Sequence, residues 1–543
     1  MHSAIEPTMR ISELIEGLRD PAAFPHAAHD LEVLQTHISV VVLAGPFAYK
    51  VKKPLDLGFL DFTTLERRRH FCEEEVRLNR RLAPEIYLGV VPLFRTAEGL
   101  RVGDRAGEGH ALEYAVRMRR LPPGASLRER LRRGDLEPGV FDELGERVAR
   151  FHREARGGPD IARFGEWAVV AGNARENLEQ TVEHVGRTVS SVVHRRLAEL
   201  LEVRLDELRP LIESRVREGR PRDTHGDLHL DHVYLLPDRE PPSDLLVIDC
   251  IEFSERFRNA DPVCDAAFLS MDLAYEGRRD LGERFERGYL ESAGDLEGGA
   301  LFPFYRSYRA AVRAKVLGMV TGSEVSEGDR RTAETRARGH WLLALSELEE
   351  PARRPALLLV GGLPGSGKST LASNLASAAN FRVIASDRVR KELAGHAPDE
   401  DLSAAYGEGI YTEEWTDRTY AACLDAARDG LFNGERILVD ATFSSDARRL
   451  EFLEAARKMG VRAGFLTCTA EPARVRSRLA ERAEEDDDLQ ISDADWAVYS
   501  AMAERWEAQA EQVAAVTRTV PTDGDPEDAL RTGESALREF GFL

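Results

Sequence analysis

The chain has 543 residues, of which 43% are hydrophobic and 31% charged, and its formal net charge is −21. This length predicts three or four folding units, and the composition excludes a disordered or fibrous protein. Because both the first 350 residues and the remainder carry more acidic than basic side chains, the charge argues against a broad nucleic-acid-binding surface, although a local basic cleft is compatible with it.

In chain order, residues 38–54 contain two β-rich runs around a Gly-Pro turn and predict a hairpin, and 64–82 predict a charged helix with an apolar stripe. The following elements are a strand over 111–121, helices over 126–155 and 178–218, a strand–loop–strand segment over 222–253 and helices to about residue 348. The charged, proline-bracketed segment 349–355 predicts a linker. After it, apolar strands alternate with helices, which is typical of a parallel sheet covered by helices.

The five cysteines are scattered without a Cys-x-x-Cys pair, which argues against a disulfide framework and is typical of a reducing cytosol. The polar start, MHSAIEPTMR, does not have the pattern of a signal peptide. The longest apolar runs, near 38–43 and 356–360, are too short to span a bilayer. We therefore expect a soluble cytoplasmic protein without a membrane partner, and the sequence leaves its oligomeric state open.

The strongest motif is Gly362-Leu-Pro-Gly-Ser-Gly-Lys-Ser369, which matches G-x-x-x-x-G-K-[ST] between an apolar strand and a predicted helix. Its glycines allow backbone N–H groups to wrap a phosphate, Lys368 neutralises the β/γ charge and Ser369 can bind Mg²⁺. The predicted nucleotide-binding residues are Gly362, Gly365, Gly367, Lys368, Ser369 and Thr370. The alternative is a chance glycine-rich turn, which the strand–motif–helix context disfavours.

Two acids near this motif follow predicted strands. Asp440 ends the strand 437–440, where a carboxylate can hold a metal ion through water, or can simply end a strand in a turn. Asp387 can accept a proton from an acceptor hydroxyl, or can cap a helix. Arg390 is placed to position that acceptor.

A later helix carries Arg474, Arg478 and Arg482 at i, i+4 and i+8. One helical face therefore presents three guanidinium groups, which suits a clamp on a transferring phosphoryl group. The alternative is a solvated basic face paired with Glu481 and Glu484.

These residues together resemble the P-loop kinase family of polynucleotide kinases, gluconate kinases and zeta toxins, in its bacterial ATP-binding branch. The resemblance covers 355–515 and rests on the P-loop, Ser386-Asp-Arg-Val-Arg-Lys-Glu-Leu393, Asp440-Ala-Thr-Phe443 and Ser492-Asp-Ala-Asp495. It implies phosphoryl transfer from a nucleoside triphosphate to a hydroxyl, with Asp387 activating the acceptor and lid arginines stabilising the transfer. It does not identify the acceptor.

In the first half, His225-Gly-Asp-Leu-His229 lies in a predicted loop and Asp249 ends a strand. Asp227 and Asp249 suit a base and a metal ligand that a hairpin brings together. His225 and His229 suggest a metal site, but no cysteine or third clustered ligand completes it in the sequence, so a structural role is the commoner interpretation.

Upstream, Lys50 and Lys52 lie on one face of the strand 47–53, and Glu75 on the next helix can pair with a phosphate-orienting lysine. The alternative for the lysines is a solvated edge that discourages strand pairing. The alternative for Glu75 is one more charge in a run of three glutamates.

As a set, these residues resemble the aminoglycoside phosphotransferase group of eukaryotic-kinase-like enzymes, whose signature is H-G-D-L-H-x-x-N with a later I-D-x-x-E. The resemblance runs over about 35–320. It implies an α+β bilobal kinase-like domain over 1–350, with lobes of about 1–120 and 121–350, followed by an α/β P-loop domain with a parallel sheet over 351–543.

The same resemblance assigns roles to residues. It makes Asp227 the catalytic base, Asp249 the metal ligand, and Lys50 with Glu75 the phosphate-orienting pair. Lys52 is the second candidate for the lysine, and 118–121 is the hinge that receives adenine.

One residue departs from the family pattern: His232 stands where the family has a metal-binding asparagine. Imidazole is a poorer partner than oxygen for Mg²⁺. Either another group such as Asp231 substitutes, or the site binds one metal, or the domain is catalytically weak and regulatory.

We therefore expect a tandem phosphotransferase that uses ATP or GTP with Mg²⁺ and phosphorylates a small-molecule hydroxyl at each of two sites. One alternative is a single active P-loop kinase with a regulatory or substrate-binding N-terminal domain. The other is a nucleic-acid 5′-hydroxyl kinase, which the acidic charge disfavours.

Overall fold

The computed structural model describes residues 10–58, 60–103, 111–241, 243–320, 326–397, 409–484 and 496–543, and the side chains of all of these except 482–484. The chain divides into two compact units. Unit 1 comprises 1–170, 209–272 and 280–302, and unit 2 comprises 171–208, 273–279 and 303–543. The five boundaries of this division fall within helices α6 (Trp167–Glu179), α7 (Ser191–Arg217), α9 (Pro262–Tyr275), α10 (Arg279–Ala293) and α11 (Phe302–Val320).

Unit 1 begins with a sheet whose described strands have the order β1-β2-β3-β6-β4-β5, all antiparallel. Their bounds are β1 Glu32–Gln35, β2 Ser39–Ala44, β3 Phe47–Lys52, β4 Tyr87–Thr96, β5 Gly99–Val102 and β6 Glu113–Arg119. The predicted hairpin is confirmed as β2–β3, with Val42 opposite Tyr49. Leu14 and Leu18 of helix α1 (Ile11–Leu18) belong to the hydrophobic core that also contains buried residues of this sheet.

The predicted helix over 64–82 is α2 (Leu65–Asn79), which begins after Thr64 because the threonine side chain accepts a hydrogen bond from the Arg67 N–H. The single helix predicted over 126–155 is instead two, α3 (Leu127–Arg133) and α4 (Gly139–Glu154). The break has a local cause, since Gly134 takes a left-handed conformation with φ 72° and ends α3.

Two short antiparallel pairs support the loops of the first predicted site: β7 (Arg222–Asp223) with β10 (Asn259–Ala260), and β8 (Val233–Leu235) with β9 (Leu245–Val247). The loops after β7 and β9 lie close together, because His225 Nε2 is 2.9 Å from the Ile248 carbonyl oxygen. The remaining described helices of unit 1 include α5 (Pro159–Ala162), α8 (Glu255–Arg258) and nearly all of α10 (Arg279–Ala293).

Unit 2 contains a parallel sheet with the order β12-β13-β11-β14-β15 among its described strands. Their bounds are β11 Ala356–Gly361, β12 Arg382–Ala385, β13 Arg436–Asp440, β14 Arg462–Thr469 and β15 Thr517–Pro521. All six residues of β11 are buried, which explains its unbroken apolar sequence, since a central parallel strand is covered on both faces. The predicted α/β architecture is thus confirmed, whereas the short polar edge strand β15 was not predicted.

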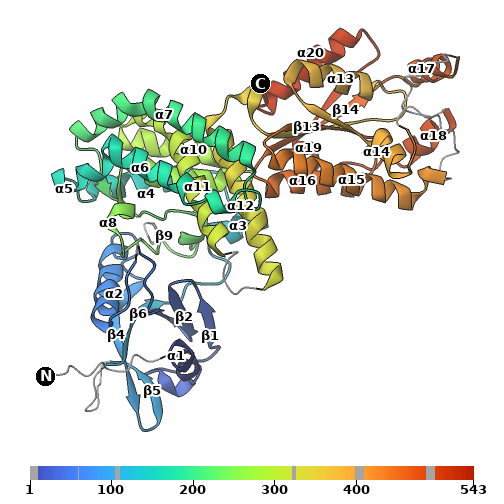
Figure 1. Cartoon of the computed structure of the whole chain (residues 1–543). Coiled ribbons are helices and arrows are strands. Elements are labelled where there is room, and N and C mark those ends of the chain that lie inside the picture. Colours follow the sequence, from blue (N-terminus) through green and yellow to red (C-terminus); the bar gives the residue numbers. More distant parts are fainter. Residues whose placement is uncertain are drawn as a thin grey trace. The chain divides into compact units, whose positions relative to one another are not determined.

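Helices surround this sheet (Figure 1). They are α13 Lys368–Ala379, α14 Ser386–Leu393, α15 Glu413–Phe432, α16 Asp446–Lys458, α17 Pro472–Glu484, α18 Trp496–Glu504, α19 Glu511–Ala515 and α20 Pro526–Glu539. Unit 2 also holds most of α11 (Phe302–Val320) and all of α12 (Glu327–Leu348).

The predicted linker 349–355 is an ordered, packed turn. Glu349 is buried and accepts hydrogen bonds from Arg196 of α7, and Arg436 of β13 donates to the Pro351 carbonyl at 2.9 Å. The chain between α12 and β11 is therefore anchored on both sides within unit 2.

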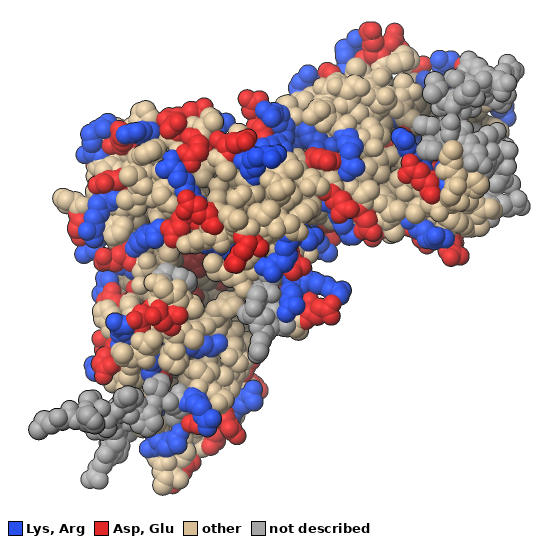
Figure 2. Space-filling model, viewed as in Figure 1, with Lys and Arg blue, Asp and Glu red and all other residues tan. Residues whose placement is uncertain are grey.

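Basic and acidic side chains alternate over the described surface that Figure 2 shows. The five cysteines all lie in described ranges, where they are buried and have free thiols. Among the described helices, none combines the length and apolar character that crossing a membrane requires.

Candidate active sites

The glycine-rich loop joins the end of β11 to the start of α13. A Cβ atom at Gly362 would lie 2.8 Å from the Cys468 carbonyl oxygen of β14, and one at Gly365 would lie 2.8 Å from a methyl of Val475 on α17. Gly365 also has φ 73°, a conformation that side-chain-bearing residues rarely adopt. The loop is therefore held in a narrow turn that only glycine fits, as a phosphate-wrapping backbone requires.

Asp440 lies beside this loop because β13 and β11 are parallel neighbours with Val360 opposite Asp440. Its carboxyl group is buried, and its Oδ1 has no hydrogen-bond partner among the described residues. Burial raises the pKa of Asp440, whereas Lys368 and a hydrogen bond from Ser369 oppose the rise. A buried oxygen next to a lysine and a serine hydroxyl fits a site for nucleotide phosphate with Mg²⁺.

The predicted nucleotide-binding residues at the start of α13 are accessible. Lys368 is half-buried, and Ser369 and Thr370 are exposed. Asp387 lies in the first turn of α14, where its charge contributes to the raised pKa of Asp440 after the larger effect of burial. The structure therefore brings Lys368, Asp387 and Asp440 to the same edge of the sheet.

Arg390 is buried and makes contacts that the sequence did not predict. Its Nη1 donates to the Ile410 carbonyl at 2.9 Å and to the Thr416 hydroxyl at 3.3 Å, and its guanidinium lies 5.3 Å from the Tyr411 ring centroid. Arg390 thus anchors the segment that leads into α15.

The arginines of α17 have different environments. Arg478 donates hydrogen bonds to the Thr522 carbonyl and, at 3.4 Å, to the Gly365 carbonyl. Arg474 is exposed. The side chain of Arg482 and the segment 492–495 lie outside the described residues. Arg478 is therefore the predicted lid arginine that the structure places against the P-loop.

Sequence reasoning missed Thr522, which follows the unpredicted strand β15. Its hydroxyl donates to the Ser366 carbonyl of the P-loop at 2.5 Å. A threonine near the chain's end carries no motif that could have indicated this contact.

In unit 1, Glu75 of α2 connects both lysines of β3. Lys50 Nζ lies 2.9 Å from Glu75 Oε1 and pairs with Asp249, and Lys52 Nζ lies 2.7 Å from Glu75 Oε2 and pairs with Glu252. The Lys50 side chain is 11% exposed and that of Lys52 is 0% exposed. Lys50 is therefore the lysine that faces Asp249, and Lys52 is the more deeply buried of the two.

These charges remain ionised although they are buried. Burial alone would raise the pKa of Asp249, but Lys50 holds it well below its usual range. Burial alone would lower the pKa of Lys50, but Asp249 and Glu75 raise it well above the ordinary lysine value. A charged lysine beside a charged carboxylate is the arrangement that positions nucleotide phosphates and a metal ion in kinases.

Asp249 has a strained backbone, with φ 65° at a residue other than glycine. Its N–H donates to the Tyr87 hydroxyl at 3.0 Å, and the next N–H, of Cys250, donates to Asn79 Oδ1 at 2.9 Å. Tyr87 and Asn79 therefore hold the aspartate in place, and neither was predicted from the sequence.

Asp265 of α9 holds the loop that carries Asp227. The Asp265 carboxylate accepts hydrogen bonds from the N–H groups of His225 and Gly226 at 3.0 and 2.8 Å. His225 Nε2 lies 2.9 Å from the Ile248 carbonyl oxygen, which ties this loop to the one that carries Asp249. Burial lowers the pKa of His225, so this histidine is a neutral structural residue.

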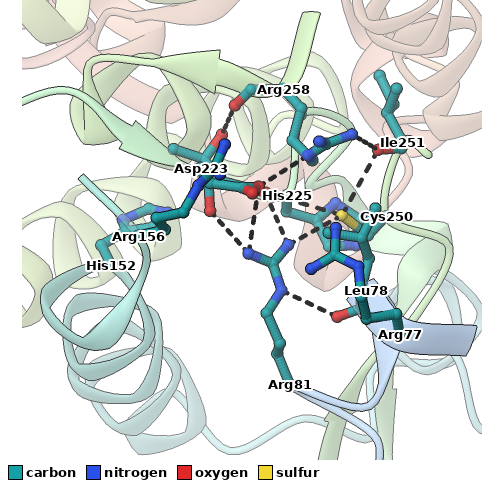
Figure 3. Close-up of polar contacts among 12 residues, drawn as sticks. Arg77, Leu78, Arg81, His152, Arg156, Asp223, His225, Cys250, Ile251 and Arg258 are labelled. Carbon is teal, nitrogen blue, oxygen red and sulfur yellow. Dashed lines mark hydrogen bonds and ion pairs between the residues drawn. The ribbon is translucent and has the colours of Figure 1, made fainter. Parts of the chain in front are cut away.

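Figure 3 shows a second set of hydrogen bonds that hold these loops, made by Arg81 and Arg258. Arg81, just after α2, donates to the Asp223 carbonyl at 2.8 Å and to the Thr224 carbonyl at 3.1 Å, while Arg258 donates to the Asp223 carboxylate at 2.7 Å and to the Ile251 carbonyl at 2.8 Å. Arg81 therefore couples α2, which carries Glu75, to the loop that carries Asp227.

The sequence paired His225 with His229 as a candidate metal site, whereas the structure groups His229 with two other residues. Asp227, His229 and His232 each offer a metal-ligating atom, and these atoms lie within 4.8 Å of one another. The sequence analysis did not predict this grouping, which arises because a short 3₁₀ turn, Leu230–His232, brings His232 back over His229, with ring centroids 3.9 Å apart.

His232 lies next to both predicted functional acids. Its Nε2 is 3.5 Å from Asp249 Oδ2 and its Nδ1 is 3.5 Å from Asp227 Oδ2. Burial, together with His229, lowers the pKa of His232 to about 4. Asp231, the suggested substitute ligand, instead accepts a hydrogen bond from Arg128 Nε at 2.7 Å. Asp249 thus fits Mg²⁺, but His232 offers nitrogen where a second oxygen ligand is expected.

Comparison with known proteins defines the class. The model of the phosphotransferase enzyme family matches residues 61–302, and that of an AAA domain matches 357–508. The chain is therefore a kinase-like phosphotransferase region followed by a P-loop kinase domain. It is 36% identical over 419 residues to the uncharacterized protein Rv2004c of Mycobacterium tuberculosis (strain ATCC 25618 / H37Rv), covering 77% of this chain and 80% of that protein, and it belongs to the same family.

Two solved structures are also similar. One is a choline/ethanolamine kinase family protein from Mesorhizobium loti, with 14% identity, coverage of 62% of this chain and 99% of that chain, and a TM-score of 0.34. The other is a gluconokinase from Sinorhizobium meliloti 1021, with 18% identity, coverage of 35% and 95%, and a TM-score of 0.26.

Proposed function

We propose that the protein is a tandem phosphotransferase, in which each unit transfers the γ-phosphoryl group of ATP or GTP to a hydroxyl of a small molecule. The observation that supports this most directly is that each unit places a lysine beside a metal-capable carboxylate: Lys50 with Asp249, and Lys368 with Asp440. Mg²⁺ bound with the nucleotide would neutralise phosphate charge at both sites.

The chain's own residues perform the remaining tasks of this mechanism. Lys50 and Lys368 stabilise the charge on the transferring phosphoryl group. Asp227 in unit 1 and Asp387 in unit 2 accept the proton of the acceptor hydroxyl. Arg478 lies against the P-loop, where its guanidinium can reach a bound phosphate.

The test uses the full chain and γ-labelled ATP and GTP against sugars, polyols, nucleosides and aminoglycosides. Removing a general base typically costs about 10²- to 10⁴-fold in rate. We therefore expect Asp227→Asn to abolish one labelled product and Asp387→Asn another. Asp238→Asn, an exposed aspartate in the loop between β8 and β9, is the matched control and should retain both. A variant that keeps every product at the wild-type rate would show that its site is not a kinase for these acceptors.

A second candidate function is a single active P-loop kinase with a regulatory kinase-like region. It is favoured by His232, whose imidazole lies beside Asp227 and Asp249 where an oxygen ligand is expected. Calorimetric titration of Mg-ATP into full-length Lys368→Ala discriminates the two. Binding at unit 1 without acceptor-dependent turnover supports the regulatory role, and turnover excludes it.

A further inference from the structure

The cluster of Asp227, His229 and His232 has the chemistry of a site for borderline transition metals. Two imidazoles and one carboxylate form the protein ligand set of several zinc enzymes, whereas Mg²⁺ prefers an all-oxygen set. His229 is buried, and Asp227 and His232 are half-buried. The cluster is therefore only partly exposed to solvent.

The spacing of the ligand atoms agrees with this chemistry. Asp227 Oδ2 lies 3.4 Å from His229 Nε2, and the metal-ligating atoms that Asp227, His229 and His232 offer all lie within 4.8 Å of one another. Two ligands about 2.0–2.1 Å from one tetrahedral ion are about 3.4 Å apart, whereas neighbouring ligands of octahedral Mg²⁺ are about 2.9 Å apart. The 3.4 Å separation between Asp227 Oδ2 and His229 Nε2 matches a four-coordinate ion.

Outer contacts of the kind that orient metal-binding histidines are also present. His229 Nδ1 accepts a hydrogen bond from the Asp231 N–H at 3.3 Å and lies 3.5 Å from Asp231 Oδ2, while the other oxygen of Asp231 accepts a hydrogen bond from Arg128 at 2.7 Å. His232 Nδ1 lies 2.9 Å from the Asp227 carbonyl oxygen, which leaves Nε2 toward Asp249 Oδ2. These contacts fix the orientation of both rings, and the carbonyl oxygen behind His232 increases the basicity of that imidazole as a ligand.

We propose that Asp227, His229 and His232 bind a divalent transition-metal ion of the Zn²⁺ type in preference to Mg²⁺, with the fourth position open to water or to Asp249. Binding itself does not rest on the proposed phosphoryl transfer. One consequence does rest on it: an ion held by Asp227 occupies the carboxylate proposed as the base, so it inhibits transfer at unit 1 until it is removed.

The direct test is titration of Co²⁺ into the metal-free full chain without nucleotide. Four-coordinate Co²⁺ absorbs strongly in the visible range, so we expect a spectrum that saturates at one ion per chain, that Zn²⁺ abolishes and that a large excess of Mg²⁺ leaves unchanged. His232→Asn, which supplies an oxygen in place of the imidazole, should weaken Co²⁺ binding at least tenfold. His37→Asn, at an exposed histidine between β1 and β2, is the matched control and should bind as the wild type does.

A second variant distinguishes loss of the metal site from misfolding of the chain. Asp227→Asn removes the carboxylate charge with little change in shape and should also lose the spectrum, while its melting temperature without metal stays at the wild-type value. A wild-type chain that lacks the spectrum, or both variants retaining it, would overturn the proposal and identify a hydrogen-bonded cluster. A wild-type chain that shows the Co²⁺ spectrum but, when metal-free, has no kinase activity would instead contradict the proposed function alone.

Discussion

The two carboxylate oxygens of Glu75 serve different lysines, and this gives Lys50 and Lys52 different tasks. Lys52 is fully buried between Glu75 and Glu252 and lies 4.9 Å from the Phe62 ring centroid. Lys50 retains some exposure and faces Asp249. A spacing of two residues in one strand thus separates a fully buried lysine from one that faces Asp249.

Replacing each lysine by methionine should therefore have different effects. Lys52→Met leaves Glu252 buried without its cation, and breaking a buried ion pair in this way costs about 3–5 kcal/mol in the free energy of unfolding. Lys50→Met leaves Glu75 paired with Lys52, so it should destabilise less but should abolish nucleotide binding at unit 1. Chemical denaturation and nucleotide titration of both variants check this, and equal destabilisation with equal binding would contradict it.

At the scale of elements, the P-loop is a narrow turn between β11 and α13 whose conformation depends on its glycines. Gly365 combines a left-handed backbone with a close approach to α17. Gly395, in the turn after α14, has a similar φ of 81° but no neighbouring atom within 4 Å of its Cβ position. Comparing substitutions at the two glycines therefore distinguishes the effect of backbone strain from the effect of crowding.

We expect Gly365→Ala and Gly395→Ala each to lose about 1 kcal/mol of stability from the left-handed conformation. Only Gly365→Ala should also lose nucleotide binding at the P-loop, because its Cβ would lie 2.8 Å from Val475 and displace the loop. Thermal melting and ATP titration in the Lys50→Met background measure the two effects. Unchanged ATP binding in Gly365→Ala would refute the role of crowding.

Helix α12 is held to its neighbours by Glu347, which pairs with Arg279 and, at 2.8 Å, with Arg306. Burial alone would raise the pKa of Glu347, but the two arginines lower it to about 2. Because the folded-state pKa lies below the unfolded one, this glutamate stabilises the fold above about pH 4.5, and the contribution is lost as the pH falls toward 2.

Glu347→Gln should accordingly lose about 3 kcal/mol at pH 7, and the difference from wild type should shrink steadily below pH 4.5. Glu327→Gln on the same helix is the control, because Glu327 is 76% exposed and pairs with an exposed arginine, so it should change stability by less than about 1 kcal/mol. Urea unfolding between pH 7 and pH 3 gives the comparison. A pH-independent difference would show that hydrogen bonding rather than charge holds the helix.

At the scale of the whole molecule, the two compact units do not coincide with the two family matches. Unit 2 joins the P-loop sheet to residues 171–208, 273–279 and 303–350 of the kinase-like region. The contact is close: a Cβ atom at Gly339 of α12 would lie 2.5 Å from the Lys458 carbonyl oxygen, and Arg457 pairs with Glu276 at 3.2 Å. The P-loop domain and these helices therefore form one body.

Gly339→Ala tests this contact. Alanine usually stabilises a helix relative to glycine, by up to about 1 kcal/mol, and Gly172→Ala on α6, where the Cβ position has no neighbour within 4 Å, should show that gain. Gly339→Ala should instead destabilise the chain, because backbone atoms of Lys458 cannot move aside easily. Differential scanning calorimetry and limited proteolysis between α12 and β11 measure the outcome, and a stabilised Gly339→Ala chain would disprove the close approach.

The local sequence determined the P-loop, the parallel sheet of the second half and the β2–β3 hairpin, because each depends on neighbouring residues: apolar strands, turn glycines and a lysine at a helix start. The resemblance to a known family, rather than local sequence, placed Lys50, Glu75, Asp227 and Asp249 in one site. It missed Tyr87, Asn79, Asp265 and Thr522, whose partners are distant in sequence and whose residue types carry no motif.

Only the tertiary structure decided which lysine faces Asp249, because that depends on how α2 packs against β3. It also decided that His232 joins Asp227 and His229, because a single 3₁₀ turn between them sets the direction of the ring. Spacing along a chain predicts proximity only where the backbone is regular, so loops and long-range ion pairs are settled by packing. In an acidic chain of net charge −21, packing thus selects the few cations that face the proposed sites.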